Sequence, residues 1–272
     1  MLVTASIVVY KTNVIELEKV LKSTVSSLVD IVYLVDNSPL NESLDSFRDF
    51  SSKICYISNP ANTGFGAGHN LAIRKALEIA SDFHIVINPD IYFEYGVIEK
   101  LLLFMNSHED VGLVMPKVLY PSGEIQYLCK LLPTPMDLFG RRFIPSKKYL
   151  EYKNNKYEFR FTDYNTIMEV PSLSGCFMFL RASILKQTGG FDERYFMYAE
   201  DLDLCRRIGE VAKTIYYPEV CVYHKYAKES YTNKKLLKYH ICSIIKYFNK
   251  WGWLFDSKRD EINRHILEKY DN

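Results

Sequence analysis

The first 90 residues alternate short apolar segments with segments of helical periodicity, and this alternation is the strongest constraint on the fold. The apolar segments are rich in β-branched residues, which is typical of strands that are buried on both faces. The segments between them repeat apolar residues at helical spacing, and Asn13 can cap the first helix. This order predicts an α/β fold with a doubly wound sheet that is parallel in this half. The predicted strands are residues 4–10, 31–36, 54–58 and 83–90, and the predicted helices are 14–28 and 66–80.

Polar side chains occur at or just after the ends of the predicted strands. In sheets of this kind, ligands bind beyond the carboxyl ends of the strands. We therefore expect a single crevice to hold the polar residues found there, which are Asp36, Asn62, Asn70, Asn88 and Asp90.

The second half of the chain predicts a mixed sheet. Residues 111–118, 170–181 and 212–225 have the composition of strands, the last of them one or two. Residues 130–165 are rich in Pro, Lys, Arg and Tyr and have weak periodicity, so we expect a long, partly mobile loop that faces a substrate. We expect residues 1–230 to form one domain.

Residues 231–272 predict an amphipathic helical extension, for which two interpretations stay open. The apolar face could pack on the parent domain. Alternatively, the helix could rest on an anionic membrane through its lysines and through Trp251 and Trp253.

Composition and charge exclude several classes of protein. The net charge of +1 provides no overall field to recruit nucleic acid. The six cysteines are isolated and form no Cys-x-x-Cys pair, which argues against a structural zinc site and favours a reducing compartment. We find neither a signal peptide nor an apolar run long enough to span a membrane. We expect a cytoplasmic protein, either free or peripheral on the inner face of the cell membrane.

Residues 189–207 (GGFDERYFMYAEDLDLCRR) combine clustered acids with aromatic side chains. Glu200, Asp201 and Asp203 fall at or before the first turn of a predicted short helix, where acids stabilise the helix dipole. That role requires only one or two acids. Carboxylates beside aromatic side chains are also what a catalytic base requires, so this segment is a candidate catalytic site.

A glycine-rich segment, residues 62–70 (NTGFGAGHN), lies between a predicted strand and a predicted helix. Its glycines would let backbone N–H groups approach a phosphate or a sugar. It differs from the dinucleotide fingerprint, because the third glycine comes one residue early and the segment follows the third strand. A dehydrogenase of the Rossmann type is therefore disfavoured.

Asn88-Pro89-Asp90 ends a buried strand with a carboxylate, which could bind a divalent cation or could only form a turn. His224 closes a late strand and could be a metal ligand, although a lone histidine is more often a packing residue.

In their order along the chain, these motifs resemble the family 2 glycosyltransferases with a GT-A fold. The matching segments are SIVVY (6–10), VDNS (35–38), NTGFGAGHN (62–70), INPD (87–90), SGCFMFLR (174–181) and GFDERYFMYAEDLDLCRR (190–207). The resemblance covers about residues 1–225 and is greatest to the bacterial rhamnosyltransferases of O-antigen, capsule and cell-wall assembly. It implies a Rossmann-like mixed sheet flanked by helices.

The resemblance also implies roles for particular residues. Asp201 corresponds to the catalytic base, with Glu200 beside it as the reserve candidate. Asp90 corresponds to the metal-binding carboxylate of an Asp-x-Asp motif, and His224 to a late metal or diphosphate ligand. Either Arg206 or Arg207 could face the diphosphate. The other positions implied in donor binding are Val9, Tyr10, Asp36, Asn62, Gly64, Phe65, Gly66, Gly68, Asn70, Asn88, Ser174 and Gly175.

One position departs from the family pattern. Asn88 occupies the place where many members carry the first aspartate of Asp-x-Asp. A neutral amide oxygen binds a cation more weakly than a carboxylate does. The expected cofactor is Mg²⁺ or Mn²⁺, with strict metal dependence left open.

The implied activity is an inverting transfer of L-rhamnose from dTDP-L-rhamnose, with UDP- or GDP-sugars as alternative donors. The implied acceptor is a saccharide, or a sugar on a polyprenyl diphosphate, at the inner membrane. A nucleotidyltransferase would carry a glycine-rich loop after the first strand, where this chain reads YKTNVIELEK. A non-catalytic protein that binds sugar nucleotides or glycans stays open as an alternative.

Overall fold

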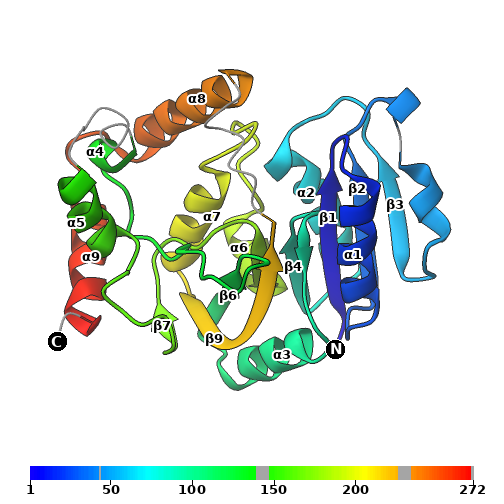
Figure 1. Ribbon diagram of the computed structural model, residues 1–272, viewed down its shortest axis with the longest axis horizontal. Coiled ribbons are helices and arrows are strands. Elements are labelled where there is room, and N and C mark those ends of the chain that lie inside the picture. Colours follow the sequence, from blue (N-terminus) through cyan, green and yellow to red (C-terminus); the bar gives the residue numbers. More distant parts are fainter. Residues whose placement is uncertain (43, 139–146, 226–233, 271–272) are drawn as a thin grey trace.

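The computed structural model describes residues 1–42, 44–138, 147–225 and 234–270 (Figure 1). Its described strands form one mixed sheet in the order β3-β2-β1-β4-β8-β6-β9-β5, with β7 paired to β9. In chain order, the described elements are β1 (Val3–Val9), α1 (Val14–Val25), β2 (Ile31–Asp36), the 3₁₀ turns η1 (Leu40–Glu42) and η2 (Asp45–Asp49), β3 (Ile54–Ser58), α2 (Phe65–Glu78), β4 (Phe83–Ile87), β5 (Ile91–Tyr92), α3 (Val97–Ser107), β6 (Val111–Leu119), α4 (Pro135–Leu138), α5 (Lys147–Tyr157), β7 (Met168–Glu169), β8 (Phe177–Arg181), α6 (Ala182–Thr188), α7 (Glu200–Gly209), β9 (Lys213–His224), α8 (Lys234–Trp251) and α9 (Ser257–Tyr270).

The N-terminal half is the parallel α/β unit that the alternation predicts. Strands β1 to β4 pair with one another in parallel, so their carboxyl ends lie at one edge of the sheet. Helix α1 begins as predicted, because the Asn13 side chain accepts hydrogen bonds from the amides of Ile15 and Glu16. The predicted strand 83–90 is shorter than expected, because the chain turns after Ile87 and resumes as β5.

Alternate side chains of the parallel strands are buried on opposite faces of the sheet. Ile7 and Leu34 share a core cluster with Leu17 of α1. Val8 and Val35 belong to a separate cluster with α2, whose small side chains allow close approach. Burial on both faces explains why these strands are continuously apolar in sequence.

The second half completes a mixed sheet, as expected, through β8. This strand is antiparallel to both β4 and β6, and its first residue Phe177 pairs with Ile87 at the end of β4. Residues 212–225 form a single strand, β9. The predicted strand 170–181 was too long, since residues 170–176 have no regular strand structure and only β8 does. The start of β8 therefore lies at the edge of the sheet where β1 to β4 end.

The expectation of one long loop over residues 130–165 is wrong, because the described part contains α4 and α5. The sequence of α5, KKYLEYKNNKY, is so polar that it has no clear apolar stripe. Its last residue, Tyr157, is nevertheless buried in the main core.

The C-terminal segment is helical, as predicted, but it forms two helices rather than one. Helix α8 ends before Gly252, which adopts φ 105° and whose added Cβ would lie 2.9 Å from the Phe255 carbonyl oxygen. Helix α8 (orange) lies along the top of the view in Figure 1, and α3 lies along the bottom.

Candidate functional site

The start of β8 joins the two acidic segments that the sequence singles out. The amide of Gly175 donates to Asp201 Oδ2 at 2.9 Å, and the next carbonyl, that of Cys176, accepts from the amide of Asn88 at 2.9 Å. The segment Gly175–Cys176 therefore contacts Asp201, at the start of α7, through one residue and the Asn88–Asp90 turn through the next.

Asp201 is half-buried and held by backbone amides. Its Oδ1 accepts from the amide of Leu202 at 2.8 Å. A Cβ added to Gly175 would lie 3.0 Å from Asp201 Cβ, so a side chain there would push against Asp201. Asp201 keeps partial exposure to the sheet edge, which a base must have to reach a substrate.

Glu200 differs from its neighbour because it is buried, with 4% exposure. Burial, with the Asp201 charge second, raises the pKa of Glu200 to about 8. Its Oε2 has no hydrogen-bond partner among the described residues. Glu200 is therefore mostly protonated at neutral pH, which leaves Asp201 as the better candidate for a base.

Backbone strain lies directly before this pair of acids. Tyr198 and Ala199 both adopt left-handed conformations, with φ of 71° and 65°. Non-glycine residues pay a free-energy cost there, and such strain clusters at active sites. The strain turns the chain into α7 so that Glu200 points inward and Asp201 toward Gly175.

Asp90 and His224 also come together, as the sequence proposes. Their strands pair through Ile91 and His224, and Asp90 Oδ1 lies 3.3 Å from His224 Nε2. Burial alone would lower the pKa of His224, but contacts with Cys176 and Asp90 raise it to about 10. Without a metal, the pair is therefore a carboxylate–imidazolium contact at neutral pH, and His224 Nε2 can ligate a cation only after it loses its proton.

Gln126 holds the histidine in place, and sequence reasoning missed it. Its Oε1 accepts from His224 Nδ1 at 3.0 Å, and its Nε2 donates to the His224 carbonyl at 2.7 Å. The bond to Nδ1 directs Nε2 toward Asp90. No motif marks Gln126, since its partner lies 98 residues away in sequence.

The residues present fit a divalent cation bound together with a ligand. Asn88 Oδ1 is buried and has no hydrogen-bond partner among the described residues, although it lies in the same turn as Asp90. One carboxylate, one imidazole and one amide oxygen match a cation whose remaining ligands come from phosphate. Within the described ranges, no group of three or more His, Cys, Asp or Glu side chains could hold a metal ion by itself.

The glycines of the 62–70 segment pack against protein atoms, and the approach of their backbone N–H groups to a phosphate or sugar stays a prediction. A Cβ added to Gly64 would lie 2.1 Å from the Phe196 carbonyl oxygen, and one added to Gly66 would lie 2.8 Å from Phe191 Cβ. At Gly68 the neighbour would be Val8, at 2.9 Å. These glycines let the 190–200 segment and β1 approach α2.

Asn70 has a structural role, and its predicted contact with the donor stays a prediction. Its amide group exchanges two hydrogen bonds of 2.8 Å with the backbone of Phe191, and it donates to Glu193 at 2.9 Å. Asn70 is buried, so its side chain ties α2 to the segment that leads to Asp201.

Asp36 is likewise occupied by protein partners. Its buried carboxylate accepts from the amides of Ser38 and Leu44 and from the Tyr56 hydroxyl, at 2.7 to 2.9 Å. Asp36 therefore organises the loop after β2, and the role in donor binding that the resemblance implies for it stays a prediction.

The other predicted donor residues lie along the same sheet edge. Val9 is buried at the end of β1, and Tyr10 just beyond it is 47% exposed. Asn62 adopts φ 44° and its Oδ1 accepts from the amide of Gly64. Phe65 packs edge-on against Phe191, with ring centroids 5.8 Å apart.

Ser174 is half-buried immediately before Gly175, and its Oγ accepts from the amide of Cys176 at 3.4 Å. Ser174 therefore adjoins the Gly175–Cys176 segment that contacts Asp201 and Asn88.

Neither predicted arginine is free to face a diphosphate. Both guanidinium nitrogens of Arg206 bond to Asp256 at 2.7 Å, and this ion pair is buried. Arg207 bonds to Asp203 and to carbonyl oxygens of residues 188–190. The two arginines instead hold α7 to its neighbours.

The aromatic residues of segment 189–207 have two different positions. Phe191 lines the site beside Gly66. Tyr195 is buried in a cluster with α8, and Phe196 and Tyr198 contact Tyr239 and His240 of that helix. Most of these rings therefore pack against α8 and do not surround Glu200 and Asp201.

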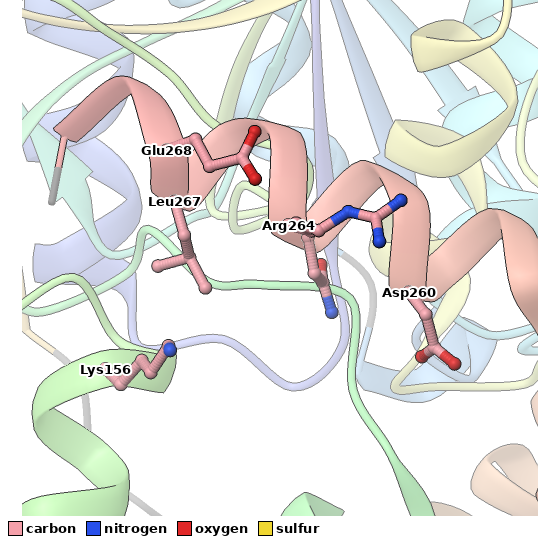
Figure 2. A pocket seen from close by; sticks show the side chains of 6 residues that line it. Lys156, Asp260, Arg264, Leu267 and Glu268 are labelled. Atoms are coloured by element: carbon pink, nitrogen blue, oxygen red, sulfur yellow. The ribbon is translucent and has the colours of Figure 1, made fainter.

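A cavity of about 530 Å³ lies between α5 and α9, away from this site (Figure 2). None of the predicted site residues lines it. Its lining residues are Lys156, Asp260, Asn263, Arg264, Leu267 and Glu268.

Comparison with known proteins agrees with this geometry. The family model for glycosyl transferase family 2 matches residues 6–189. An N-acetylglucosaminyl-diphospho-decaprenol L-rhamnosyltransferase of Mycobacterium tuberculosis (strain ATCC 25618 / H37Rv) is 29% identical over 207 residues, which cover 71% of this chain and 66% of that protein. The rhamnosyltransferase WbbL of Escherichia coli (strain K12) is 24% identical over 212 residues, which cover 74% of this chain and 75% of that protein. The chain spans about two thirds of the length of the mycobacterial relative.

A solved structure supports the fold. The crystal structure of GalNAc-T7 with UDP, GalNAc and Mn²⁺ matches with a TM-score of 0.62 at 14% identity, covering 83% of this chain and 43% of that one. The mixed sheet with its flanking helices is the arrangement shared with such GT-A enzymes. The family model covers more than half of the chain, so the prediction is confirmed: the chain belongs to glycosyl transferase family 2 and has the GT-A fold.

Proposed function

We propose that the chain is an inverting rhamnosyltransferase that transfers L-rhamnose from dTDP-L-rhamnose to a lipid-linked saccharide in bacterial polysaccharide synthesis. Family membership supports the transfer chemistry, and the names of the two bacterial relatives support the sugar. The name of the mycobacterial relative includes a polyprenyl diphosphate acceptor, which supports the acceptor class.

The observation that carries the proposal is the position of Asp201 relative to Asp90 and His224. A single displacement requires a base on one side of the anomeric carbon and a leaving diphosphate on the other. Only the segment Gly175–Cys176, just before β8, lies between Asp201 and the Asn88–Asp90 turn: Gly175 bonds to Asp201, and Cys176 bonds to Asn88.

In the proposed reaction, Asp201 takes the proton of an acceptor hydroxyl as that oxygen bonds to the anomeric carbon. The bond from that carbon to the diphosphate oxygen breaks, and the nucleoside diphosphate leaves with the electron pair. Asp90 and His224, with the Asn88 oxygen beside them, would hold Mg²⁺ or Mn²⁺. When bound, the cation would neutralise charge on the leaving diphosphate. Glu200 stays protonated and so does not compete for the acceptor proton.

The donor would lie beyond the ends of β1 and β2, where Tyr10 is an exposed aromatic ring. Aromatic rings are suitable partners for a nucleotide base. Because Asp36 is internally bonded, we propose that it supports this pocket through the loop after β2.

The first experiment is a thermal-shift screen of dTDP-, UDP- and GDP-sugars with and without Mn²⁺. A ligand at 100 times its Kd stabilises a protein by about 2.7 kcal/mol, which such a screen detects easily. Stabilisation by UDP- or GDP-sugars and not by dTDP-L-rhamnose would overturn the donor assignment.

Turnover is then measured with dTDP-L-rhamnose and an N-acetylglucosaminyl diphosphate lipid. NMR of the product tests inversion through the configuration of the new anomeric centre. Donor binding without any transfer to saccharide acceptors would instead indicate a protein that only binds sugar nucleotides.

A further inference from the structure

The turn between α8 and α9 exposes two large apolar side chains next to each other. Leu254 is 74% exposed and Phe255 is 95% exposed. The neighbouring tryptophans are held more closely: Trp253 packs against Phe248 and donates to Asn249, and Trp251 donates to the buried Asp203. Leu254 and Phe255 are thus the projecting part of this turn.

The turn is held in a defined conformation from both sides. The amide of Gly252 donates to the Phe248 carbonyl at 2.8 Å as α8 ends. Asp256, immediately after Phe255, is buried and ion-paired with Arg206 of α7. Because this backbone is already ordered, insertion of the two side chains would not carry the cost of ordering a loose loop.

The surface of α8 that leads to this turn is cationic. Its exposed lysines are Lys234, Lys235, Lys238 and Lys246, and exposed Ile241 and Ile245 lie among them. Residues 234–255 include no Asp or Glu. Lysines with apolar side chains and no acids complement an anionic lipid surface.

We propose that the Leu254–Phe255 turn inserts into the interface of an anionic membrane and that the exposed lysines of α8 bind its lipid headgroups. Helix α8 would lie on the surface: within the described ranges, every helix is too short or too polar to cross a membrane. Two projecting side chains are far fewer than the roughly 20–30 residues per side of a stable protein interface, so a lipid surface is favoured over a second copy of the chain. The inference rests on the proposed function for its purpose, because a lipid-linked acceptor lies in a membrane.

The test is co-sedimentation of the full chain with phosphatidylcholine vesicles that contain or lack phosphatidylglycerol. It needs neither donor nor turnover, so its result is separate from that of the transfer assay. We expect binding only with phosphatidylglycerol. Replacing both apolar side chains (Leu254→Ser with Phe255→Ser) should weaken binding at least about tenfold, because both lose their burial in the interface.

A matched control removes two exposed apolar side chains elsewhere, Tyr95→Ser with Leu103→Ser. Tyr95 precedes α3 and Leu103 lies on it, and α3 and α8 lie at opposite ends of the view in Figure 1. This control should bind like the wild type. Lys234→Gln with Lys238→Gln should weaken binding about fivefold per lysine and should reduce its dependence on phosphatidylglycerol.

Thermal unfolding of each variant establishes that it is folded, and transfer to a lipid-free acceptor should be unchanged. Failure of the wild type to bind phosphatidylglycerol vesicles would overturn the proposal. So would equal binding by the Leu254/Phe255 variant and the α3 control. If that variant instead abolished a dimer seen by analytical ultracentrifugation, the turn would be an interface between copies and the proposal would fall.

Discussion

Asp201 Oδ2 accepts a hydrogen bond of 2.9 Å from the amide of Gly175, which fixes the first turn of α7 against the start of β8. The contact depends on the missing side chain of Gly175, since a Cβ there would lie 3.0 Å from Asp201 Cβ. One residue further, Cys176 bonds to Asn88, so the position of the carboxylate and the position of the Asp90 turn are set by the same backbone.

Replacing Asp201 by asparagine should remove the base while preserving this arrangement, because an amide oxygen can still accept from Gly175. General-base catalysis contributes typically 10²–10⁴-fold, so we expect Asp201→Asn to lose about that factor in kcat. Donor affinity, measured by calorimetry, should stay close to that of the wild type. Near-normal turnover would contradict the assignment of Asp201 as the base.

Asp203→Asn is the matched control for Asp201→Asn, because it removes a carboxylate two residues away on the same helix. Asp203 is fully buried and bonds to Arg207, Lys250 and Trp251. Breaking a buried charge network costs about 3–5 kcal/mol, so this variant should lose free energy of unfolding, measured by urea denaturation. Any loss of activity in it should follow the loss of folded protein.

Glu200 should make the stability of the protein fall as pH rises. Burial raises the pKa of its carboxyl to about 8 from an ordinary value of 4.5. Between these values the folded state binds a proton that the unfolded state has released, so the free energy of unfolding decreases with pH in that window and levels off above it.

The measurement compares the wild type with Glu200→Gln, which keeps a neutral side chain at every pH. Relative to the wild type, the glutamine variant should gain stability from about pH 5 to pH 8, on the order of a few kcal/mol. Parallel pH profiles for the two proteins would mean that Glu200 is ionised in the folded state.

Gly64→Ala tests whether the glycine loop is closed by protein atoms. The new Cβ would lie 2.1 Å from the Phe196 carbonyl oxygen. Overpacking typically costs about 1–3 kcal/mol, in addition to the backbone strain at φ 93°. Gly96→Ala is a control for open space, since no described atom lies within 4 Å of an added Cβ, although its ψ of −11° strains alanine less than the −176° of Gly64 does. Thermal unfolding should show a clearly larger loss for Gly64→Ala.

The sequence was sufficient for features that depend on near neighbours. Three such features are present as predicted: the apolar runs of β1 and β2, the Asn13 cap, and the acids at the start of α7. Each depends only on residues that are close in sequence. It was insufficient where a residue's partner is distant. From the sequence, the glycines at 64 and 66 suggest only close approach to a ligand, and their packing against Phe196 and Phe191 is seen only in the structure. An arginine on an acidic helix suggests a phosphate ligand until Asp256 is seen beside Arg206.

Gln126→Ala should weaken binding of the metal without removing a ligand. Gln126 directs His224 Nε2 toward Asp90 by accepting from Nδ1, and loss of such a supporting partner typically costs 10–100-fold in metal affinity. The readout is Mn²⁺ binding by electron paramagnetic resonance in the presence of a nucleoside diphosphate. Gln187→Ala, at an exposed position on α6, should leave that affinity unchanged. Equal affinity in both variants would remove His224 from the metal site.

The buried pair of Arg206 and Asp256 should be among the most costly contacts to break, because it joins α7 to the start of α9. Its side chains are 2% and 5% exposed. Arg206→Met leaves the Asp256 carboxylate buried without its partner and should cost about 3–5 kcal/mol. Lys213→Met, which breaks an exposed pair with Asp110, should cost far less, because solvent screens that pair.

The double variant Arg206→Met with Asp256→Leu separates the cost of an unpaired charge from the value of the contact. Removing both charges should recover much of the stability lost by Arg206→Met alone, since well-packed apolar side chains often replace a buried ion pair at little cost. Urea denaturation of the three variants and the wild type gives the comparison. If the double variant were as unstable as Arg206→Met, the loss would come from the geometry that the guanidinium imposes, including its stacking over Trp251 at 4.2 Å. In that case the guanidinium of Arg206, rather than the ion pair alone, would be the structural link between α7 and the C-terminal helices.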